Sequence, residues 1–127
     1  METVFGIGMD LIEIDRVVKA CKNPSFLDKY YSKKEQRLFE KRPCRAATNF
    51  AGIEAVVKAL GTGFCPIQPS EVEILRKESG APYVVFSGNA LTFVKEHHII
   101  KVHISLSDTK TEAAAYAVAI TETKTTI

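Results

Sequence analysis

Two carboxylates, one ammonium group and a glycine-bracketed turn are the residues of this sequence best suited to chemistry on a phosphate. Glu54 and Lys58 stand four residues apart in an apolar stretch, which places both on one face of a helix. The turn Gly61-Thr62-Gly63 follows, and Asp10 ends a short apolar segment near the N-terminus. Carboxylates are ligands for Mg²⁺, lysine supplies a point charge for a phosphate, and glycines let backbone N–H groups approach an anion. This combination indicates a phosphate- or pyrophosphate-containing substrate.

Each of these residues also has a purely structural interpretation. A Glu54–Lys58 pair with i,i+4 spacing is commonly a surface ion pair worth a few tenths of a kcal/mol. Asp10 stands where a strand is expected to give way to a helix, and an aspartate there is commonly the helix N-cap. One side chain cannot easily be both a cap and a metal ligand. The spacing alone leaves both interpretations open.

Hydrophobic periodicity predicts an α+β domain with a largely antiparallel sheet, in the order β-α-α-α-β-β-α-β-β. Ser32 and Glu35 have the spacing of a capping box, which predicts the start of a helix there. The expected strands are residues 3–9, 72–75, 83–86, 99–107 and 112–121, and the expected helices are one starting at residue 11, one at 32–41, a long one ending at 60 and one starting after 87.

The long helix must position Glu54 and Lys58. Alanines recur along it every four residues and form an apolar stripe, and Gly61 is suited to end it as a C-cap. Gly6 and Gly8, in the first strand, predict either a close approach of two backbones or a bulge.

Size, charge and cysteine content narrow the class of protein. The 127 residues suit a single domain spanning 1–127, and a net charge of +2 is too small to indicate nucleic-acid binding. The longest apolar run is far shorter than the ~20 residues that span a bilayer, and no signal peptide is indicated. Three cysteines without CxxC spacing argue against a disulfide framework and a structural zinc site. We therefore expect a soluble cytoplasmic protein that does not bind a membrane.

Four segments, in order over nearly the whole chain, resemble the holo-acyl-carrier-protein synthases, which are small 4′-phosphopantetheinyl transferases. The first two are the more specific: one is similar to the family's opening G-I-G-x-D-x-x-E-x-x-R and the other to its K-E-A-x-x-K-A-x-G-T-G. In this sequence the four read Gly6-Ile-Gly-Met-Asp10-Leu-Ile-Glu13-Ile-Asp-Arg16, Phe50-Ala-Gly-Ile-Glu54-Ala-Val-Val-Lys58-Ala-Leu-Gly-Thr-Gly63, Gly80-Ala-Pro-Tyr83 and His103-Ile-Ser-Leu-Ser-Asp108.

The resemblance implies the phosphopantetheinyl transferase fold, with an antiparallel sheet packed against a long central helix and subunits forming a homotrimer. The implied activity is transfer of the 4′-phosphopantetheine arm of coenzyme A to a serine of an apo acyl carrier protein, in fatty-acid or polyketide biosynthesis. The active sites of such trimers lie between subunits. Arg16 and its neighbours on the first helix would face the acidic recognition helix of the carrier.

The resemblance also implies roles for individual residues. Asp10 and Glu54 would hold Mg²⁺, and Lys58 would contact the coenzyme A phosphates. The serine would be deprotonated by Glu54 or by a metal-bound water, and the sequence does not choose between them. Further contacts to coenzyme A would come from Gly61, Thr62, Gly63, Pro82 and Ser105.

Three positions depart from the family pattern. Ile53 replaces a lysine, Asn49 replaces an arginine and Asp108 replaces a second histidine. Each lost charge-assisted contact to phosphate would cost about 1.5–3 kcal/mol, so we expect weakened coenzyme A binding or altered specificity. The alternative function is a catalytically impaired homologue that binds a carrier protein or partners an active subunit.

Overall fold

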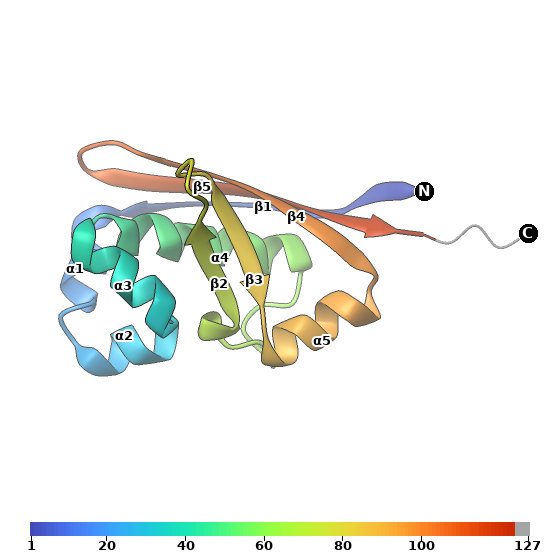
Figure 1. The fold of residues 1–127 in the computed structure, drawn as a ribbon, viewed down its shortest axis with the longest axis horizontal. Helices are drawn as coiled ribbons and strands as arrows, with labels where there is room; N and C mark the ends of the chain where they lie inside the picture. Colours follow the sequence, from blue (N-terminus) through green and yellow to red (C-terminus); the bar gives the residue numbers. More distant parts are fainter. Residues whose placement is uncertain (124–127) are drawn as a thin grey trace, which may run out of the picture.

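The structure, a computed structural model, describes residues 1–123 and has the predicted order of elements with one additional short helix. Figure 1 shows these elements along the chain. They are β1 (Glu2–Glu13), α1 (Ile14–Ala20), α2 (Pro24–Tyr30), α3 (Lys33–Lys41), α4 (Arg45–Leu60), β2 (Val72–Arg76), β3 (Pro82–Phe86), α5 (Gly88–Glu96), β4 (Ile99–Asp108) and β5 (Glu112–Glu122), with a 3-10 turn at Pro69–Glu71.

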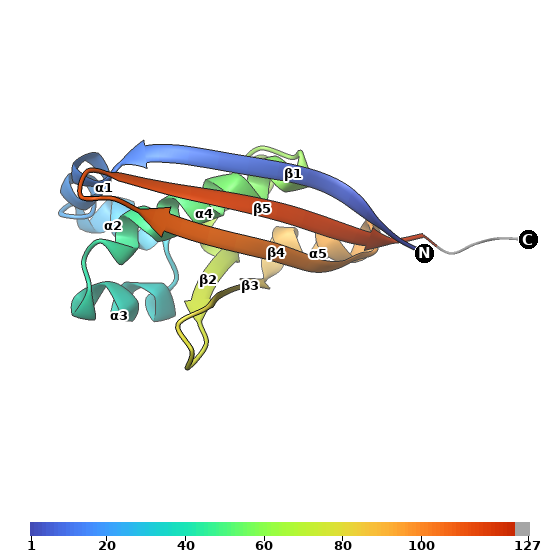
Figure 2. The same cartoon turned by 90° about the horizontal axis from the view of Figure 1, so that it is seen from above.

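All strand pairs are antiparallel, as predicted. The strands β1, β5 and β4 lie side by side in that order and form a long three-stranded sheet, which Figure 2 shows from above. The strands β2 and β3 form a separate hairpin. All the helices lie on one side of the three-stranded sheet, so its other face is left uncovered by the described residues (Figure 1).

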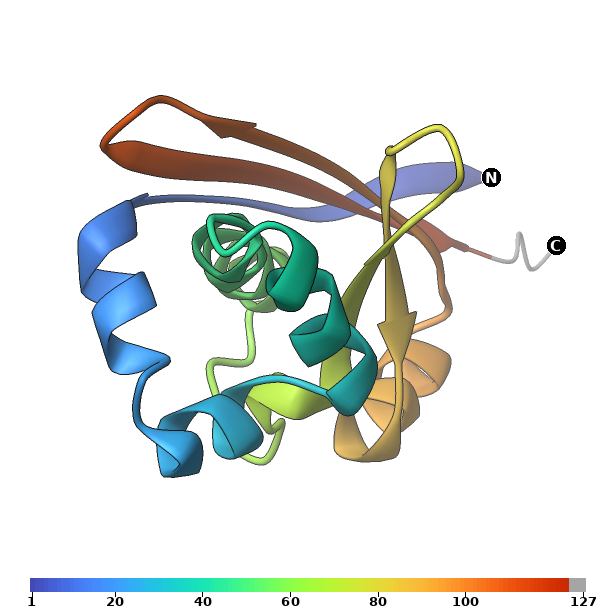
Figure 3. The same cartoon turned by 60° about the vertical axis from the view of Figure 1, so that its left-hand side comes forward.

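Helix α4 is the centre of the fold. Most of its 16 residues are buried, because it packs against β1 and β5 on one side and against α1 and α3 on others. Figure 3, which looks nearly along α4, shows it enclosed between the sheet and the other helices. The prediction of a sheet packed against a long central helix is confirmed.

Strand β1 is longer than the sequence predicts. Its pairing with β5 continues through Asp10 opposite Ala115 to Glu13 opposite Glu112, and helix α1 starts only at Ile14. The helical spacing of apolar residues from Leu11 onward is overridden by this pairing. The N-cap of α1 is Glu13, so the expectation that Asp10 ends the strand and caps a helix is wrong.

The two glycines of β1 allow the strand to lie directly on α4. A Cβ atom at Gly6 would overlap the carbonyl oxygen of Ala59, and one at Gly8 would overlap that of Ala55. The pairing register with β5 also shifts between Val4 and Gly6. Close approach and a bulge are therefore both present, and the approach at Gly8 brings the next residues of β1 against the charged face of α4.

Two local predictions are confirmed. Helix α3 begins with a complete capping box, in which the Ser32 side chain and the Glu35 side chain each accept from the other residue's backbone N–H. Helix α4 ends at Gly61 in the left-handed conformation, with a φ of 76°.

Among the helices of residues 1–123, none is both long enough and apolar enough to cross a bilayer.

Candidate active site

Asp10 and Lys58 meet across the contact between β1 and α4. The Lys58 ammonium donates to the Asp10 Oδ1 atom at 3.2 Å and to the Met9 carbonyl at 3.0 Å. The Asp10 side chain is 15% exposed, whereas that of Lys58 is 54% exposed. Lys58 thus pairs with the strand rather than with Glu54, and the interpretation of Glu54 and Lys58 as a simple helix ion pair is wrong for this structure.

Glu54 is half-buried and is bound by a residue that the sequence did not single out. The hydroxyl of Tyr30 donates to Glu54 Oε1 at 2.7 Å. The pKa of Tyr30 is raised far above its ordinary value. The largest cause is burial, and the hydrogen bond to Glu54 and the charges of Glu54 and Asp10 raise it further. The phenol therefore stays protonated and acts as a donor. The only sequence signal for it was a short apolar segment at residues 26–31.

The second oxygen of Asp10 indicates that this site suits a cation. Within residues 1–123, Asp10 Oδ2 is the buried side-chain polar atom without a hydrogen-bond partner. A buried carboxylate oxygen is costly to leave unpaired, and a cation would satisfy it. The described residues contain no cluster of three or more His, Cys, Asp or Glu side chains suited to a metal. Two carboxylates fit Mg²⁺, which keeps several waters and completes its coordination with substrate phosphates.

The glycine turn after α4 is only partly available to an anion. The Gly61 N–H donates to the carbonyls of Val57 and Lys58 and so completes the helix C-cap. Gly63 also has a positive φ, of 63°, and a Cβ atom added at either glycine would meet open space. The backbone conformation therefore requires glycine there, and the expected N–H contact from Gly61 to a phosphate is not available in this arrangement.

Pro82 and Ser105 lie away from the carboxylates of the same chain. Pro82 lines a pocket of about 260 Å³ near the start of α4, together with Arg42, Arg45 and Arg76. That pocket also contains Thr48, which lies ten residues before Lys58, or about 15 Å along the helix axis. One chain therefore carries two separate groups of candidate residues.

Ser105 points to the uncovered face of the sheet. It pairs with Tyr116, which pairs in turn with Met9, and all three side chains are exposed. Asp10, the next residue of β1, points to the opposite face because side chains alternate along a strand. The single chain therefore does not bring Ser105 together with Asp10.

Two of the three departures from the family pattern belong to the core. Ile53 and Asn49 are both fully buried, with no exposed surface. The Asn49 amide donates to Glu35 Oε2 at 2.8 Å and to the Ile74 carbonyl at 2.9 Å, and its oxygen accepts from Arg76 Nη2 at 2.7 Å. Asn49 thus holds an arginine at the pocket lined by Pro82, so the pocket is not left without a cation.

The carboxyl of Glu35, at the centre of this network, is unusual. It is fully buried, and burial raises its pKa to about 7 although the hydrogen bonds from Ser32, Asn49 and Ile74 lower it. Its capping-box spacing identified a helix start but no buried charge. Asp108, the third departure, is exposed and lines the same arginine pocket.

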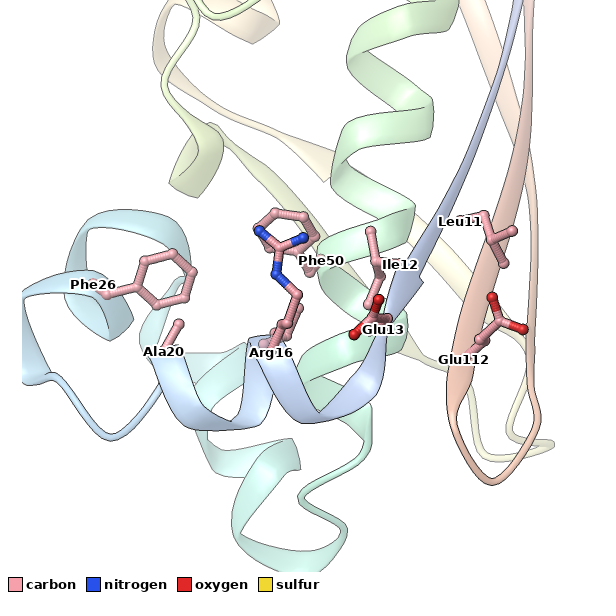
Figure 4. A pocket seen from close by; sticks show the side chains of 9 residues that line it. Leu11, Ile12, Glu13, Arg16, Ala20, Phe26, Phe50 and Glu112 are labelled. Atoms are coloured by element: carbon pink, nitrogen blue, oxygen red, sulfur yellow. The ribbon is translucent and has the colours of Figure 1, made fainter.

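A second pocket lies beside the first helix. Figure 4 shows this pocket, which has a volume of about 420 Å³ and is lined by residues of β1, α1, α2, α4 and β5. Its charged groups are Arg16 of α1, Glu13 and Glu112. Its aromatic walls are the rings of Phe26 and Phe50. The stacked rings of Phe26, Tyr30 and Phe50 connect these walls to the Tyr30 hydroxyl and so to Glu54.

Comparisons with known proteins agree on one family. The family model described as the 4′-phosphopantetheinyl transferase superfamily matches residues 6–121. The holo-[acyl-carrier-protein] synthase of Lachnoclostridium phytofermentans is 50% identical over 115 residues, which cover 91% of this chain and 94% of that protein.

Solved structures extend the likeness to the fold. The Plasmodium yoelii acyl carrier protein synthase with ADP bound matches with a TM-score of 0.86 and 27% identity, over 97% of this chain and 99% of that one. The Helicobacter pylori holo-[acyl-carrier-protein] synthase in complex with coenzyme A matches with a TM-score of 0.80 and 27% identity, over 89% and 98%.

Proposed function

The chain belongs to the 4′-phosphopantetheinyl transferase superfamily, and from this premise we propose which of its residues carry out each part of the reaction. The protein transfers the 4′-phosphopantetheine arm of coenzyme A to a serine of an apo acyl carrier protein. The observation that carries our assignment is the buried Oδ2 atom of Asp10 beside Lys58, which has no hydrogen-bond partner in the described part of the chain. It supports a cation site at the junction of β1 and α4.

Asp10 and Glu54 are the proposed ligands of Mg²⁺. Bound there, the ion supplies charge stabilisation for the coenzyme A pyrophosphate and for the reacting phosphoryl group. Lys58 is half-exposed and lies within hydrogen-bonding distance of Asp10, so its ammonium group can turn toward the same phosphates. Thr62 and Gly63 remain proposed phosphate contacts on the turn that follows α4.

The departures at Asn49 and Ile53 do not argue for an impaired homologue. Both side chains are in the core, and the carboxylates and lysine that would bind metal and phosphate are present. The alternative hypothesis of a non-catalytic partner subunit was based on these departures, so the burial of Asn49 and Ile53 removes most of the support for it.

We further propose that the active protein is a homotrimer formed through the uncovered face of the three-stranded sheet. Ile7, Met9, Leu11 and Tyr116 are between 44% and 60% exposed, and such apolar exposure on a continuous face is typical of an interaction surface. Association there would bring the arginine pocket of one subunit toward the carboxylates of the next. The separation of the two groups along α4 supports a site of this composite kind.

The arginine pocket is then the proposed binding place of the adenosine 3′-phosphate of coenzyme A. Guanidinium groups suit phosphate because they donate two parallel hydrogen bonds. Arg76→Ala should raise the KM for coenzyme A about 10-fold or more but leave that for 3′-dephospho-coenzyme A little changed. Equal increases in the KM for both substrates would contradict the assignment of the arginine pocket to the 3′-phosphate.

Arg16 is the proposed contact of α1 with the carrier protein. It is exposed at the rim of the pocket in Figure 4, where it can meet an acidic helix. Arg16→Glu should slow the reaction chiefly through the KM for the carrier, and the effect should shrink with added salt. A KM for the carrier that does not change would exclude this contact.

Mass spectrometry tests the whole proposal. The pure protein is incubated with MgCl₂, coenzyme A and an apo acyl carrier protein, and the carrier is then weighed. A mass gain equal to the phosphopantetheine arm is expected with the natural protein, and its loss is expected with Asp10→Asn. The proposed roles fail if the natural protein leaves several apo carriers unmodified, or if Asp10→Asn modifies them at the natural rate.

A further inference from the structure

Among residues 1–123, Tyr30 is the one side chain that forms a hydrogen bond with Glu54. It is the last residue of α2, and Glu54 lies in the third turn of α4, so the contact joins two separate elements. The distance from the Tyr30 hydroxyl to Glu54 Oε1 is 2.7 Å, which is short, as is usual for a hydroxyl that donates to a carboxylate.

The ring of Tyr30 is fixed by its neighbours. It stacks on Phe50 with a centroid distance of 4.7 Å and an interplanar angle of 15°, and on Phe26 at 5.4 Å and 20°. Tyr31 packs against it edge to face at 5.3 Å. Because a stacked ring has little rotational freedom, its hydroxyl is held in place rather than swinging toward solvent.

The hydrogen bond uses one oxygen of Glu54. Oε1 accepts from Tyr30, and the other oxygen is left for a different partner. Glu54 lies one helical turn before Lys58, whose ammonium group bonds to Asp10, so Glu54 and Asp10 both lie at the junction of β1 and α4. A carboxylate that binds a metal is commonly oriented by such an outer hydrogen bond.

We propose that Tyr30 is a positioning residue that orients the Glu54 carboxylate for Mg²⁺, with Oε1 held by the phenol and the second oxygen turned to the ion. This inference rests on the proposed metal role of Asp10 and Glu54. The resemblance of the chain to its family did not point to Tyr30, and the contact is found only in the tertiary structure.

The test is the pair Tyr30→Phe and Tyr31→Phe. Tyr30→Phe keeps the ring stack and removes only the hydroxyl. Tyr31→Phe is the matched control, because the neighbouring hydroxyl donates to the Ala46 carbonyl instead, at 2.8 Å. Metal binding is read by electron paramagnetic resonance of Mn²⁺ and by displacement of Mn²⁺ with MgCl₂, with coenzyme A present. Circular dichroism checks that each variant is folded.

Tyr30→Phe should bind Mg²⁺ about 10- to 100-fold more weakly than the natural protein, and Tyr31→Phe should bind it equally well. The kcat of Tyr30→Phe should recover when MgCl₂ is raised. An unchanged Mg²⁺ affinity in Tyr30→Phe, or an equal loss in Tyr31→Phe, would overturn the positioning role.

Asp10→Asn separates this inference from the proposed function. If Asp10→Asn loses Mg²⁺ binding while Tyr30→Phe keeps it, only the role of Tyr30 is wrong. If Asp10→Asn also binds Mg²⁺ as the natural protein does, the metal site itself is misplaced and both proposals fall.

Discussion

The buried Glu35 carboxyl should make the protein less stable as the pH rises toward neutrality. Its side chain has no exposed surface, and burial raises its pKa to about 7 from an ordinary value of 4.5. The native state therefore keeps the proton at pH values where the unfolded chain has already released it. The stabilising contribution is fully present below the unfolded pKa and is lost as the pH rises through the folded one.

The size of the effect follows from the two pKa values. At about 1.4 kcal/mol per pKa unit, the gap between 4.5 and about 7 corresponds to about 3 kcal/mol of unfolding free energy. A glutamine at this position cannot titrate, so Glu35→Gln removes the pH dependence. Ser32 and Asn49 donate to different oxygens of Glu35, so the variant places its amide NH₂ against one of these two donors, which lowers stability by a roughly constant amount of about 1–3 kcal/mol.

Urea unfolding followed by circular dichroism measures the difference, since the chain has no tryptophan to report by fluorescence. The natural protein and Glu35→Gln are compared at one protein concentration from about pH 4 to about pH 8. We expect the free energy of the natural protein minus that of the variant to fall by about 3 kcal/mol over this range. A difference that is flat, or that rises with pH, would refute the reasoning, because every other titrating group is common to both proteins.

Three further outcomes follow from the contacts of β1, α3 and α4. Gly8→Ala should lower the unfolding free energy by about 1–3 kcal/mol or more in a denaturant titration, because the added methyl group overlaps the Ala55 carbonyl. A variant as stable as the natural protein would contradict the close packing of β1 on α4. Ser32→Ala should lower the unfolding free energy by about 1 kcal/mol in the same titration, because the capping bond from the Glu35 N–H is lost. An unchanged unfolding midpoint would mean that the cap does not stabilise the protein. Lys58→Ala should reduce kcat/KM for coenzyme A about 10- to 100-fold in a steady-state assay, and a smaller loss would argue against a direct phosphate contact.

A separate measurement tests the trimer. Leu11→Asp places a charge on the uncovered face of the sheet, where the natural side chain is 60% exposed. Sedimentation velocity should show the natural protein as a trimer and the variant as a monomer with an unchanged circular dichroism spectrum. A natural protein that sediments as a monomer at micromolar concentration would rule out this interface.

The sequence by itself determined those features that depend on neighbouring residues. The capping box that begins at Ser32 and the C-cap at Gly61 were predicted correctly, because each depends on a few adjacent residues. The positions of the short strands β2 and β3 were also predicted correctly, for the same reason. The candidate residues Asp10, Glu54 and Lys58 were also identified from sequence, since Glu54 and Lys58 stand four residues apart in an apolar stretch and Asp10 ends the first apolar segment.

Only the tertiary structure decided how those residues are paired. Local periodicity ended the first strand too early, because the pairing of β1 with β5 at the far end of the chain continues through Glu13. That pairing lays Asp10 against α4, and Lys58 then bonds to it instead of to its helical neighbour Glu54. Tyr30 takes the place at Glu54 because α2 folds back on α4.

The same reason explains what the family's substituted positions do. Asn49 and Ile53 replace an arginine and a lysine of the family pattern, so contacts to phosphate were expected to be lost there. Adjacent helix positions point in different directions, and the packing of α4 turns these two toward the core. Both side chains point inward, and Asn49 holds Arg76 of a distant strand by a hydrogen bond. Sequence spacing determined which side chains share a face of one element, whereas the packing of elements far apart in the chain decided which of those faces form the site.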